Sequence, residues 1–251
     1  MVADGVSSAI FSRPWAEILV RAILAEPPYP SDPAGFAQWL AACRAQWDGA
    51  IDTDNLAWYQ APKLADGAFS TLLWAQLFPT NEPGKYKAHS FAIGDSCLFH
   101  FRGDELVRTF PIEDSTQFAA SPVVLGSRDL GRDHLMQFGG IEIDCEEGDL
   151  LLLCTDAIAD WTLRTYEASE SIDWSRYWTI SDEEWAAEIT ELRESRAMVY
   201  DDATMLLLHV TSEGDLPPGT DGAMPQIEVS EDDDSSSLTR KWWNPFGRRD
   251  S

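Results

Sequence analysis

The chain has 251 residues, of which 44% are hydrophobic, and it contains 11 tryptophans. This apolar content is enough for one substantial domain or two small ones, which excludes a wholly disordered chain. The formal net charge of −25 argues against nucleic acid and anionic membranes as partners, because both are polyanions.

The cysteines and the N-terminal residues indicate the compartment in which the protein is expected. No two cysteines form a C-x-x-C pair, which argues against a zinc site or a redox motif, and we expect buried thiols in a reducing compartment. No stretch is long and apolar enough to span a membrane, and residues 1–9 lack the regions of a secretion signal. The sequence therefore predicts a cytoplasmic protein. The cysteines are Cys43, Cys97, Cys145 and Cys154.

The first predicted elements are helices. Ser12 is placed to cap a first helix that carries Pro14 in its first turn. Residues 33–50 predict a second, amphipathic helix. Its apolar residues at helical spacing are Phe36, Trp39, Leu40, Cys43 and Trp47.

From residue 67 the pattern changes to strands. The runs "GAFSTLLWAQLF" and "KAHSFAIG" are followed by "SCLFHF" and "ELVRTF", which flank "RGD" and predict a hairpin. "IEIDCE" alternates with period two, and "EGD" then turns into the four leucines of residues 150–153. An apolar run of this kind is typical of a strand buried on both faces.

The last elements are a helix and a strand. Ser181 and Glu184 form a capping box for a helix over residues 182–198, with Trp185, Ile189 and Leu192 on one face. "ATMLLLHV" then predicts a final buried strand. The order of the elements favours a layered α+β fold with mostly antiparallel sheet.

The composition changes after Thr211 to Gly, Pro, Ser and acids. We therefore predict a folded domain of residues 1–212 and a disordered acidic tail of residues 213–251. The tail ends with Trp242, Trp243 and Phe246 among basic residues. This end is either a docking motif, for a partner or for the domain's own acidic surface, or a segment without a role.

Aspartates stand at the ends of several predicted strands. Each one alone is typical of a turn or a cap. If the strand ends share one edge of a layered fold, the same residues form a set of ligands for a hard cation such as Mg²⁺ or Mn²⁺. A cation would also offset the mutual repulsion of these carboxylates. They are Asp4, Asp95, Asp156, Asp201 and Asp202.

These motifs, in their order, resemble the metal-dependent protein phosphatases of the type 2C (PPM) family, in a bacterial form. "VADG" opens the first helix as the family's D-G pair does, and "GAFST" matches its G-x-x-T segment. "GDSCLFHFR", "LLLLCTDAIADW" and "DDATMLLLHV" match G-D-S-R, S-D-G-L-W-D and D-N-x-T. The resemblance covers about residues 1–211 and implies a four-layer αββα sandwich of two antiparallel sheets flanked by helices.

The resemblance also implies roles for individual residues. Asp4 would bridge two metal ions, and the carbonyl of Gly5 would bind one of them. Asp156 and Asp201 would complete the first ion, and Asp95 would help Asp156 to hold a third, weaker one. The ions would be Mg²⁺ or Mn²⁺, and a water activated by them would hydrolyse phosphoserine or phosphothreonine. The implied partners are a phosphoprotein substrate and a cognate Ser/Thr kinase.

The chain departs from the family pattern in several places. Ala157 replaces a glycine, Asp202 replaces an asparagine, and Val6 with Ser7 replaces a histidine-glycine pair. Asp160 is expected to support the site or the fold without binding a metal ion. The histidines are scattered, and we expect them to be strand or loop residues; they are His89, His100, His134 and His209.

A larger departure lies at the start of the chain. The sequence opens at "MVADG", without the upstream strands that carry the family's phosphate-gripping arginine and an acid pair. Either the start is misassigned within a longer gene product, which we favour, or these strands are truly missing. Loss of the strands would expose an unpaired sheet edge.

The resemblance thus implies a bacterial Ser/Thr protein phosphatase with a role in signalling, and the composition predicts that it is cytoplasmic. Two alternatives stay open. One is a pseudophosphatase that binds a phosphoprotein or a partner without turnover, and the other is an interaction module that works through the Trp-rich tail. The sequence does not determine the substrate, the preferred metal or the oligomeric state.

Overall fold

The computed structural model describes residues 1–28, 32–53, 56, 58, 60–129 and 139–211. The predicted tail, residues 213–251, lies outside the described residues, as does His134. The helices are α1 (Ser12–Ala25), α2 (Pro33–Ala50), α3 (Gln60–Asp66), α4 (Asp156–Glu167) and α5 (Asp182–Glu194), with short 3₁₀ helices at Ser115–Ala119 and Trp174–Trp178. The strands are β1 (Phe69–Ser70), β2 (Leu72–Pro79), β3 (Lys85–Ile93), β4 (Cys97–Arg102), β5 (Glu105–Phe110), β6 (Leu125–Gly126), β7 (Gly139–Glu146), β8 (Asp149–Cys154) and β9 (Met205–His209).

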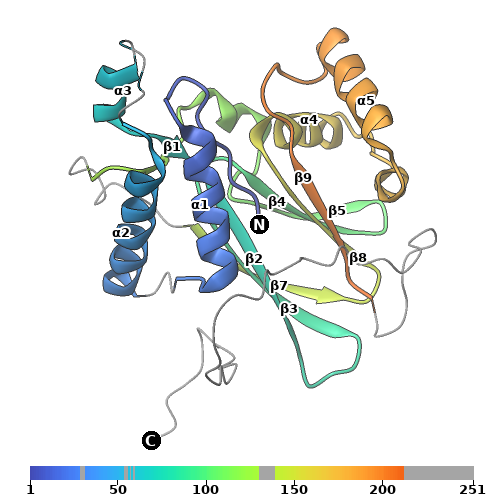
Figure 1. Cartoon of the computed structure of the whole chain (residues 1–251). Coiled ribbons are helices and arrows are strands. Elements are labelled where there is room, and N and C mark those ends of the chain that lie inside the picture. Colours follow the sequence, from blue (N-terminus) through green and yellow to red (C-terminus); the bar gives the residue numbers. More distant parts are fainter. Residues whose placement is uncertain (29–31, 54–55, 57, 59, 130–138, 212–251) are drawn as a thin grey trace, which may run out of the picture.

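Two antiparallel sheets form the centre of the molecule (Figure 1). One has the order β2-β3-β7, and the other has the order β5-β4-β8-β9. Residues before α1 lie along the edge of the first sheet, since Val2 forms an antiparallel bridge with Leu73 of β2 and Gly5 forms one with Ser70 of β1. The two-residue strands β1 and β6 pair separately.

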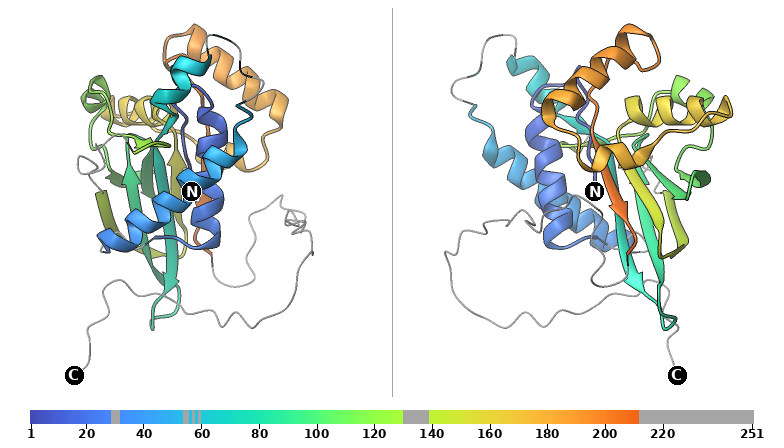
Figure 2. Two further views of the ribbon diagram at one scale, coloured as in Figure 1. Left: turned by 60° about the vertical axis from the view of Figure 1, so that its left-hand side comes forward. Right: turned by 90° about the vertical axis from the view of Figure 1, so that its right-hand side faces the viewer.

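Helices cover the outer face of each sheet, which gives four layers (Figure 2). α1 and α2 pack on the β2-β3-β7 sheet through a core that includes Trp15, Trp47 and Trp74. α4 and α5 pack on the other sheet through a core that includes Phe99, Ile158 and Ile189. Between the sheets lies a third core, which includes Leu73, Ala88, Leu98, Ile143, Leu151 and Leu153. The predicted α+β sandwich is confirmed.

The leucine run forms β8, and its residues 151–153 are buried on both faces, as predicted, whereas Leu150 is partly buried. Leu151 and Leu153 face the other sheet, whereas Leu152 and Cys154 pack beneath the helices. The strand lies between β4 and β9, so its backbone groups are paired on both edges. Asp149 and Asp156 therefore stand at the two ends of a rigid, fully covered strand.

Two short turns, among the connections between the sheets, carry the chain from the first sheet to the second. The first turn, Gly94–Asp95–Ser96, joins β3 to β4 and brings Asp95 to the end of the sandwich. Gly94 has φ +101°, and a Cβ there would lie 2.6 Å from Cγ2 of Thr71, so only glycine fits this crossing. The second crossing, at Glu147–Gly148, separates "IEIDCE" and the leucine run into different sheets.

Two expectations about local structure are wrong, and one helix was not predicted. Ser12 is the first residue of α1 and not its cap, because its hydroxyl donates to the carbonyl of Val6 (2.8 Å) while Phe11 takes the cap position with φ 56°. β9 is half exposed, with Leu206 and Leu208 exposed by 38% and 40%, because it forms the edge of its sheet. The sequence also gave no indication of α4, which begins directly after β8.

Other local expectations are confirmed. The "RGD" hairpin joins β4 to β5, and Ser181 with Glu184 forms the capping box of α5. The cysteines are buried free thiols. Within the described part of the chain, no helix has both the length and the apolar character needed to cross a bilayer.

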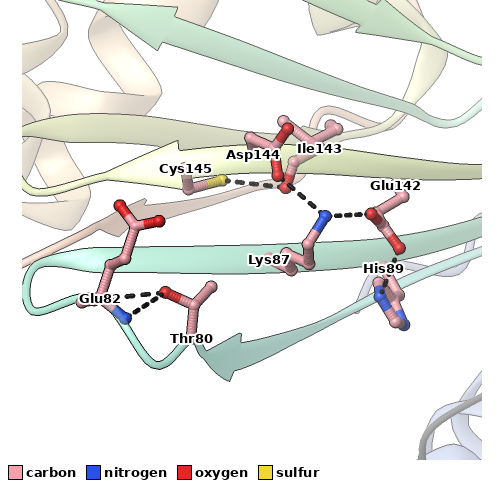
Figure 3. Close-up of polar contacts among 8 residues, drawn as sticks. All are labelled: Thr80, Glu82, Lys87, His89, Glu142, Ile143, Asp144 and Cys145. Atoms are coloured by element: carbon pink, nitrogen blue, oxygen red, sulfur yellow. Dashed lines mark hydrogen bonds and ion pairs between the residues drawn. The ribbon is translucent and has the colours of Figure 1, made fainter. Parts of the chain in front are cut away.

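Charged side chains join β3 to β7 on the outer face of their sheet (Figure 3). Lys87 forms ion pairs with Glu142 and with Asp144. Glu142 also lies 3.1 Å from Nε2 of His89. These side chains are cross-strand neighbours, and such pairs help to fix the strand register while adding little to stability where they are exposed.

Truncation of the β8 leucines is expected to destabilise the protein strongly. Leu151→Ala and Leu152→Ala each leave a cavity in a different core, so each should lower the free energy of unfolding by about 2–5 kcal/mol. The half-exposed Leu208→Ala is the control and should cost about 1 kcal/mol or less. Denaturant unfolding measures all three, and equal effects would contradict the proposed burial of β8.

Candidate functional site

The structure brings the sequence-predicted site residues to one cavity. Asp4, Gly5, Asp95, Asp156 and Asp201 all line a cavity of about 340 Å³ at one end of the sandwich. They come from four places: the segment before α1, the β3–β4 crossing, the first turn of α4 and the loop before β9. The remaining lining residues are Val6, Ser7, Ser8, Thr71, Pro122 and Val124.

Thr71 connects two of these places. Its amide N–H donates to the carbonyl of Asp4 (2.8 Å), and its Oγ1 accepts from the amide of Asp4 (3.1 Å). The same Oγ1 lies 2.7 Å from Oγ of Ser96, the residue after Asp95. One buried threonine therefore fixes the backbone of Asp4 against the turn that carries Asp95. The sequence marked Thr71 only as part of "GAFST", because a hydroxyl's partners are not visible in a motif.

Thr155 connects the other two places. Its Oγ1 donates to the carbonyl of Asp202 (3.0 Å) and accepts from the amide of Thr204 (3.1 Å). Its amide donates to the carbonyl of Thr204 (3.0 Å). Since Thr155 directly precedes Asp156, these bonds hold the loop of Asp201 next to the start of α4.

The three substitutions in the family pattern have structural outcomes. Ala157 is a buried helical residue whose backbone does not have a positive φ, so the position does not need glycine. Its amide donates to Oδ1 of Asp156 (2.7 Å). Asp202 lines a neighbouring cavity of about 510 Å³, which also includes Asp4 and Gly5. Val6 and Ser7 line the 340 Å³ cavity, and neither side chain is titratable. Asp160 forms an ion pair with Arg164 within α4, as a structural residue would.

Burial and mutual repulsion disfavour the charged forms of these carboxyls. Burial, followed by repulsion from the neighbouring aspartates, raises the pKa of Asp4 to about 7. Burial, with repulsion from Asp95 and Asp201, raises the pKa of Asp156 to about 6. Burial also raises the pKa of Asp95, although a backbone hydrogen bond opposes the shift. Among the described residues no Lys, Arg or His lines this cavity to offset the negative charge.

The donor set fits a hard divalent cation. All the candidate ligands are oxygens, from carboxylates and from one backbone carbonyl, which is the set that Mg²⁺ and Mn²⁺ prefer. The carboxylates remain spread, since within the described residues no three of them bring one oxygen each to within 4.8 Å of one another.

A second buried cluster lies at the opposite end of β8. His100, Cys145 and Asp149 bring their ligand atoms to within 4.8 Å of one another. Asp149 is saturated by the protein, because Arg102 donates to both of its oxygens (2.8 and 2.9 Å) and His100 Nε2 lies 2.7 Å away. The amide of Glu146 donates as well (2.9 Å). Burial alone would raise the pKa of Asp149, but these hydrogen bonds outweigh it and lower the pKa. This cluster is a structural network that joins the two sheets.

A family model described as protein phosphatase 2C matches residues 1–193. The chain belongs to the protein phosphatase 2C family. By family it is a protein serine/threonine phosphatase, a hydrolase of the metal-dependent class. The resemblance drawn from the aspartate motifs is thereby confirmed.

Solved structures of other phosphatases are similar to this type 2C phosphatase. They include the catalytic domain of PstP in complex with two manganese ions (16% identity, TM-score 0.48, covering 84% of this chain and 86% of that one). MsPP from Mycobacterium smegmatis is 14% identical, with a TM-score of 0.44 and the same two coverages. PppA from Pseudomonas aeruginosa is 18% identical, with a TM-score of 0.43 and 82% coverage of both chains. No curated relative matches the chain. The low identities and TM-scores leave the family model as the basis of the assignment.

The raised pKa values predict how stability depends on pH and on cations. Asp4 and Asp156 have folded-state pKa values of about 7 and about 6, both above the ordinary value of 3.8. The folded metal-free protein therefore binds more protons than the unfolded chain, so its free energy of unfolding should fall as the pH rises from about 4 to about 7. Mn²⁺ should restore stability, and its effect on Tm should be larger at about pH 7.5 than at about pH 5.

Calorimetry with and without Mn²⁺ measures these changes, and Asp4→Asn is the matched variant. It removes one repelling charge, so it should raise the Tm of the metal-free protein at about pH 7.5 and reduce the gain from Mn²⁺. A gain from Mn²⁺ that is the same in this variant and at both pH values would contradict the assignment of the cavity.

Proposed function

We propose that this type 2C phosphatase hydrolyses phosphoserine and phosphothreonine in proteins with divalent cations bound in the 340 Å³ cavity. The observation that carries the proposal is the set of carboxylates that line this cavity without a cationic side chain among the described residues. Their raised pKa values support it, because a site that repels its own charge gains most from a bound cation. The ions we propose are Mg²⁺ or Mn²⁺, two in number with a third, weaker one.

Each residue has a proposed role at the site. Asp4 would contact two ions, the carbonyl of Gly5 one of them, and Asp156 with Asp201 would hold the first. Asp95 would hold the weaker ion together with Asp156. When bound, the cations would lower the pKa of a water molecule and offset the charge of the phosphoryl group.

The chain's own residues would supply position and access. Thr71 and Thr155 fix the backbone on either side of the cavity, so the carboxylates need only rotate about their side-chain bonds to meet a cation. Asp201 is exposed, and Asp4, Asp95 and Asp156 are only partly buried, so a phosphorylated side chain can approach from solvent.

One observation favours the rival function, a pseudophosphatase. Within the described residues the cavity offers no arginine or lysine to the phosphate. Arg13 and Arg21 of α1 line the neighbouring cavity that shares Asp4 and Gly5, so they stand beside the site and not in it. A domain of this form would bind a cation and a phosphoprotein without turnover. The two functions differ only in whether the bound phosphoester is hydrolysed.

The other expectations stay proposals. They are a bacterial, cytoplasmic signalling protein that opposes a cognate Ser/Thr kinase, with a phosphatase domain over residues 1–212 and an acidic tail over residues 213–251. A phosphatase that opposes a kinase must turn over its substrate, so a measurement of phosphatase activity decides between the two functions.

The full chain is expected to hydrolyse p-nitrophenyl phosphate and a phosphothreonine peptide in the presence of Mn²⁺. Asp156→Asn and Asp201→Asn remove a ligand charge with little change in shape, so each should reduce kcat/KM by about 10²-fold or more. Asp144→Asn is the control, because Asp144 is an exposed carboxylate on β7 outside the cavity, and it should leave turnover unchanged. Steady-state kinetics and chelation by EDTA provide the measurement.

Two results would contradict the enzyme function in different ways. Turnover that persists after EDTA, or in both ligand variants, would show that the cavity is not the site. A folded chain that binds Mn²⁺ but releases no phosphate would establish the pseudophosphatase.

A further inference from the structure

Arg193, on the last turn of α5, holds the loop that carries Asp201. Its Nη2 donates to the backbone carbonyl of Asp201. Its guanidinium carbon also lies 5.7 Å from the centroid of the Tyr200 ring, in cation–π geometry. Tyr200 is 78% exposed, so the contact with Arg193 covers only a small part of its surface. One side chain of the helical layer thus reaches the backbone of a candidate ligand.

The rest of the loop is anchored at neighbouring points. Arg164 of α4 donates to the carbonyl of Ala197 (3.2 Å), and the amide of Met198 donates to the carbonyl of Leu192 (3.0 Å). On the far side, Thr155 donates to the carbonyl of Asp202 (3.0 Å). Arg193 therefore fixes the peptide of Asp201 itself, which lies between the bonds at Ala197 and Met198 on one side and the bond at Asp202 on the other.

The position of this bond matters because Asp201 lies outside regular secondary structure. It is exposed, and its carboxylate accepts only from the next amide, that of Asp202 (2.8 Å), among the bonds of the described residues. If the backbone were not fixed, the loop would lose conformational entropy when a cation binds. This loss would lower the affinity for the cation. A charged donor such as a guanidinium fixes a carbonyl more strongly than a neutral donor does.

We propose that Arg193 is a positioning residue for the cation site, which raises the affinity for a divalent cation by ordering the Asp201 peptide. The inference rests on the proposed function, because it requires Asp201 to be a ligand. Residues that orient a ligand typically change metal affinity by about 10–100-fold when they are lost.

The sign of the effect separates positioning from simple electrostatics. A guanidinium near the cavity carries the same charge as the cation and repels it. If Arg193 acted through its charge alone, its removal would strengthen cation binding. Positioning predicts the opposite, weaker binding after removal.

The test measures Mn²⁺ binding to the full chain by the electron paramagnetic resonance signal of free Mn²⁺, at about pH 7.5. Arg193→Met keeps the apolar stem but loses the donors and the charge. It should raise the Kd for Mn²⁺ by about tenfold. Arg193→Lys keeps the charge without the planar fork and should give an intermediate Kd. Arg108→Met, on an exposed position of β5, is the matched control and should bind as the wild type does. At saturating Mn²⁺, the kcat of Arg193→Met should return to near the wild-type value.

An unchanged or tighter Kd in Arg193→Met would overturn the proposal. So would a lower Tm of the metal-free variant with an unchanged Kd, because that result assigns Arg193 a structural role only. Should Arg193→Met fail to fold, Arg193→Leu takes its place, because it also lacks the donors and the charge, with the same expected weakening and the same overturning outcome.

A failure of the proposed function gives a different pattern. If the wild-type chain binds no Mn²⁺, or if Asp201→Asn binds it as tightly as the wild type, the cation site itself is wrong. In either case the result does not depend on Arg193, and the inference falls with the site.

Discussion

The structure depends on holding four aspartates at one end of a sandwich against their own repulsion. Burial and neighbouring charge raise the pKa of Asp4, Asp95 and Asp156, so the charged forms are disfavoured where they stand. The positions of these carboxylates are set by the rigid elements that carry them and not by attraction among the carboxylates. Three hydrophobic cores fix the strands and helices, and the bonds of Thr71 and Thr155 fix the connecting peptides. The packing energy of the fold thus sustains a locally unfavourable charge cluster, which is the condition for binding a cation.

The two ends of β8 show how environment separates a structural carboxylate from a candidate metal ligand. Asp149 and Asp156 flank the same buried strand. Asp149 receives donors from Arg102 and His100 of the neighbouring strand, and its pKa is lowered. Asp156 receives one backbone amide, faces other carboxylates, and its pKa is raised to about 6. A satisfied carboxylate stabilises the fold, whereas an unsatisfied one in a cavity is available for a ligand.

The helical layer on the β5-β4-β8-β9 sheet is part of the site as well as a cover for the core. α4 begins at Asp156, and Arg164 further along it binds the backbone of the loop before β9. Arg193 of α5 binds the same loop at Asp201. The site is therefore built from both sheets and from this helical layer, so the geometry of the loop is coupled to the packing of α4 and α5.

The sequence by itself determined the elements whose signal is local: the twofold burial of the leucine run, the capping box at Ser181, and the "RGD" hairpin. Ordered motifs also identified the family and the residues that meet at the cavity. Only the tertiary structure decided that "IEIDCE" and the leucine run lie in different sheets and that Leu206 and Leu208 stand on an open edge. It alone showed the links made by Thr71, Thr155 and Arg193. Periodicity and caps arise between residues a few positions apart, whereas sheet partners and hydroxyl or guanidinium contacts are set by packing between distant segments, and local sequence carries no record of them.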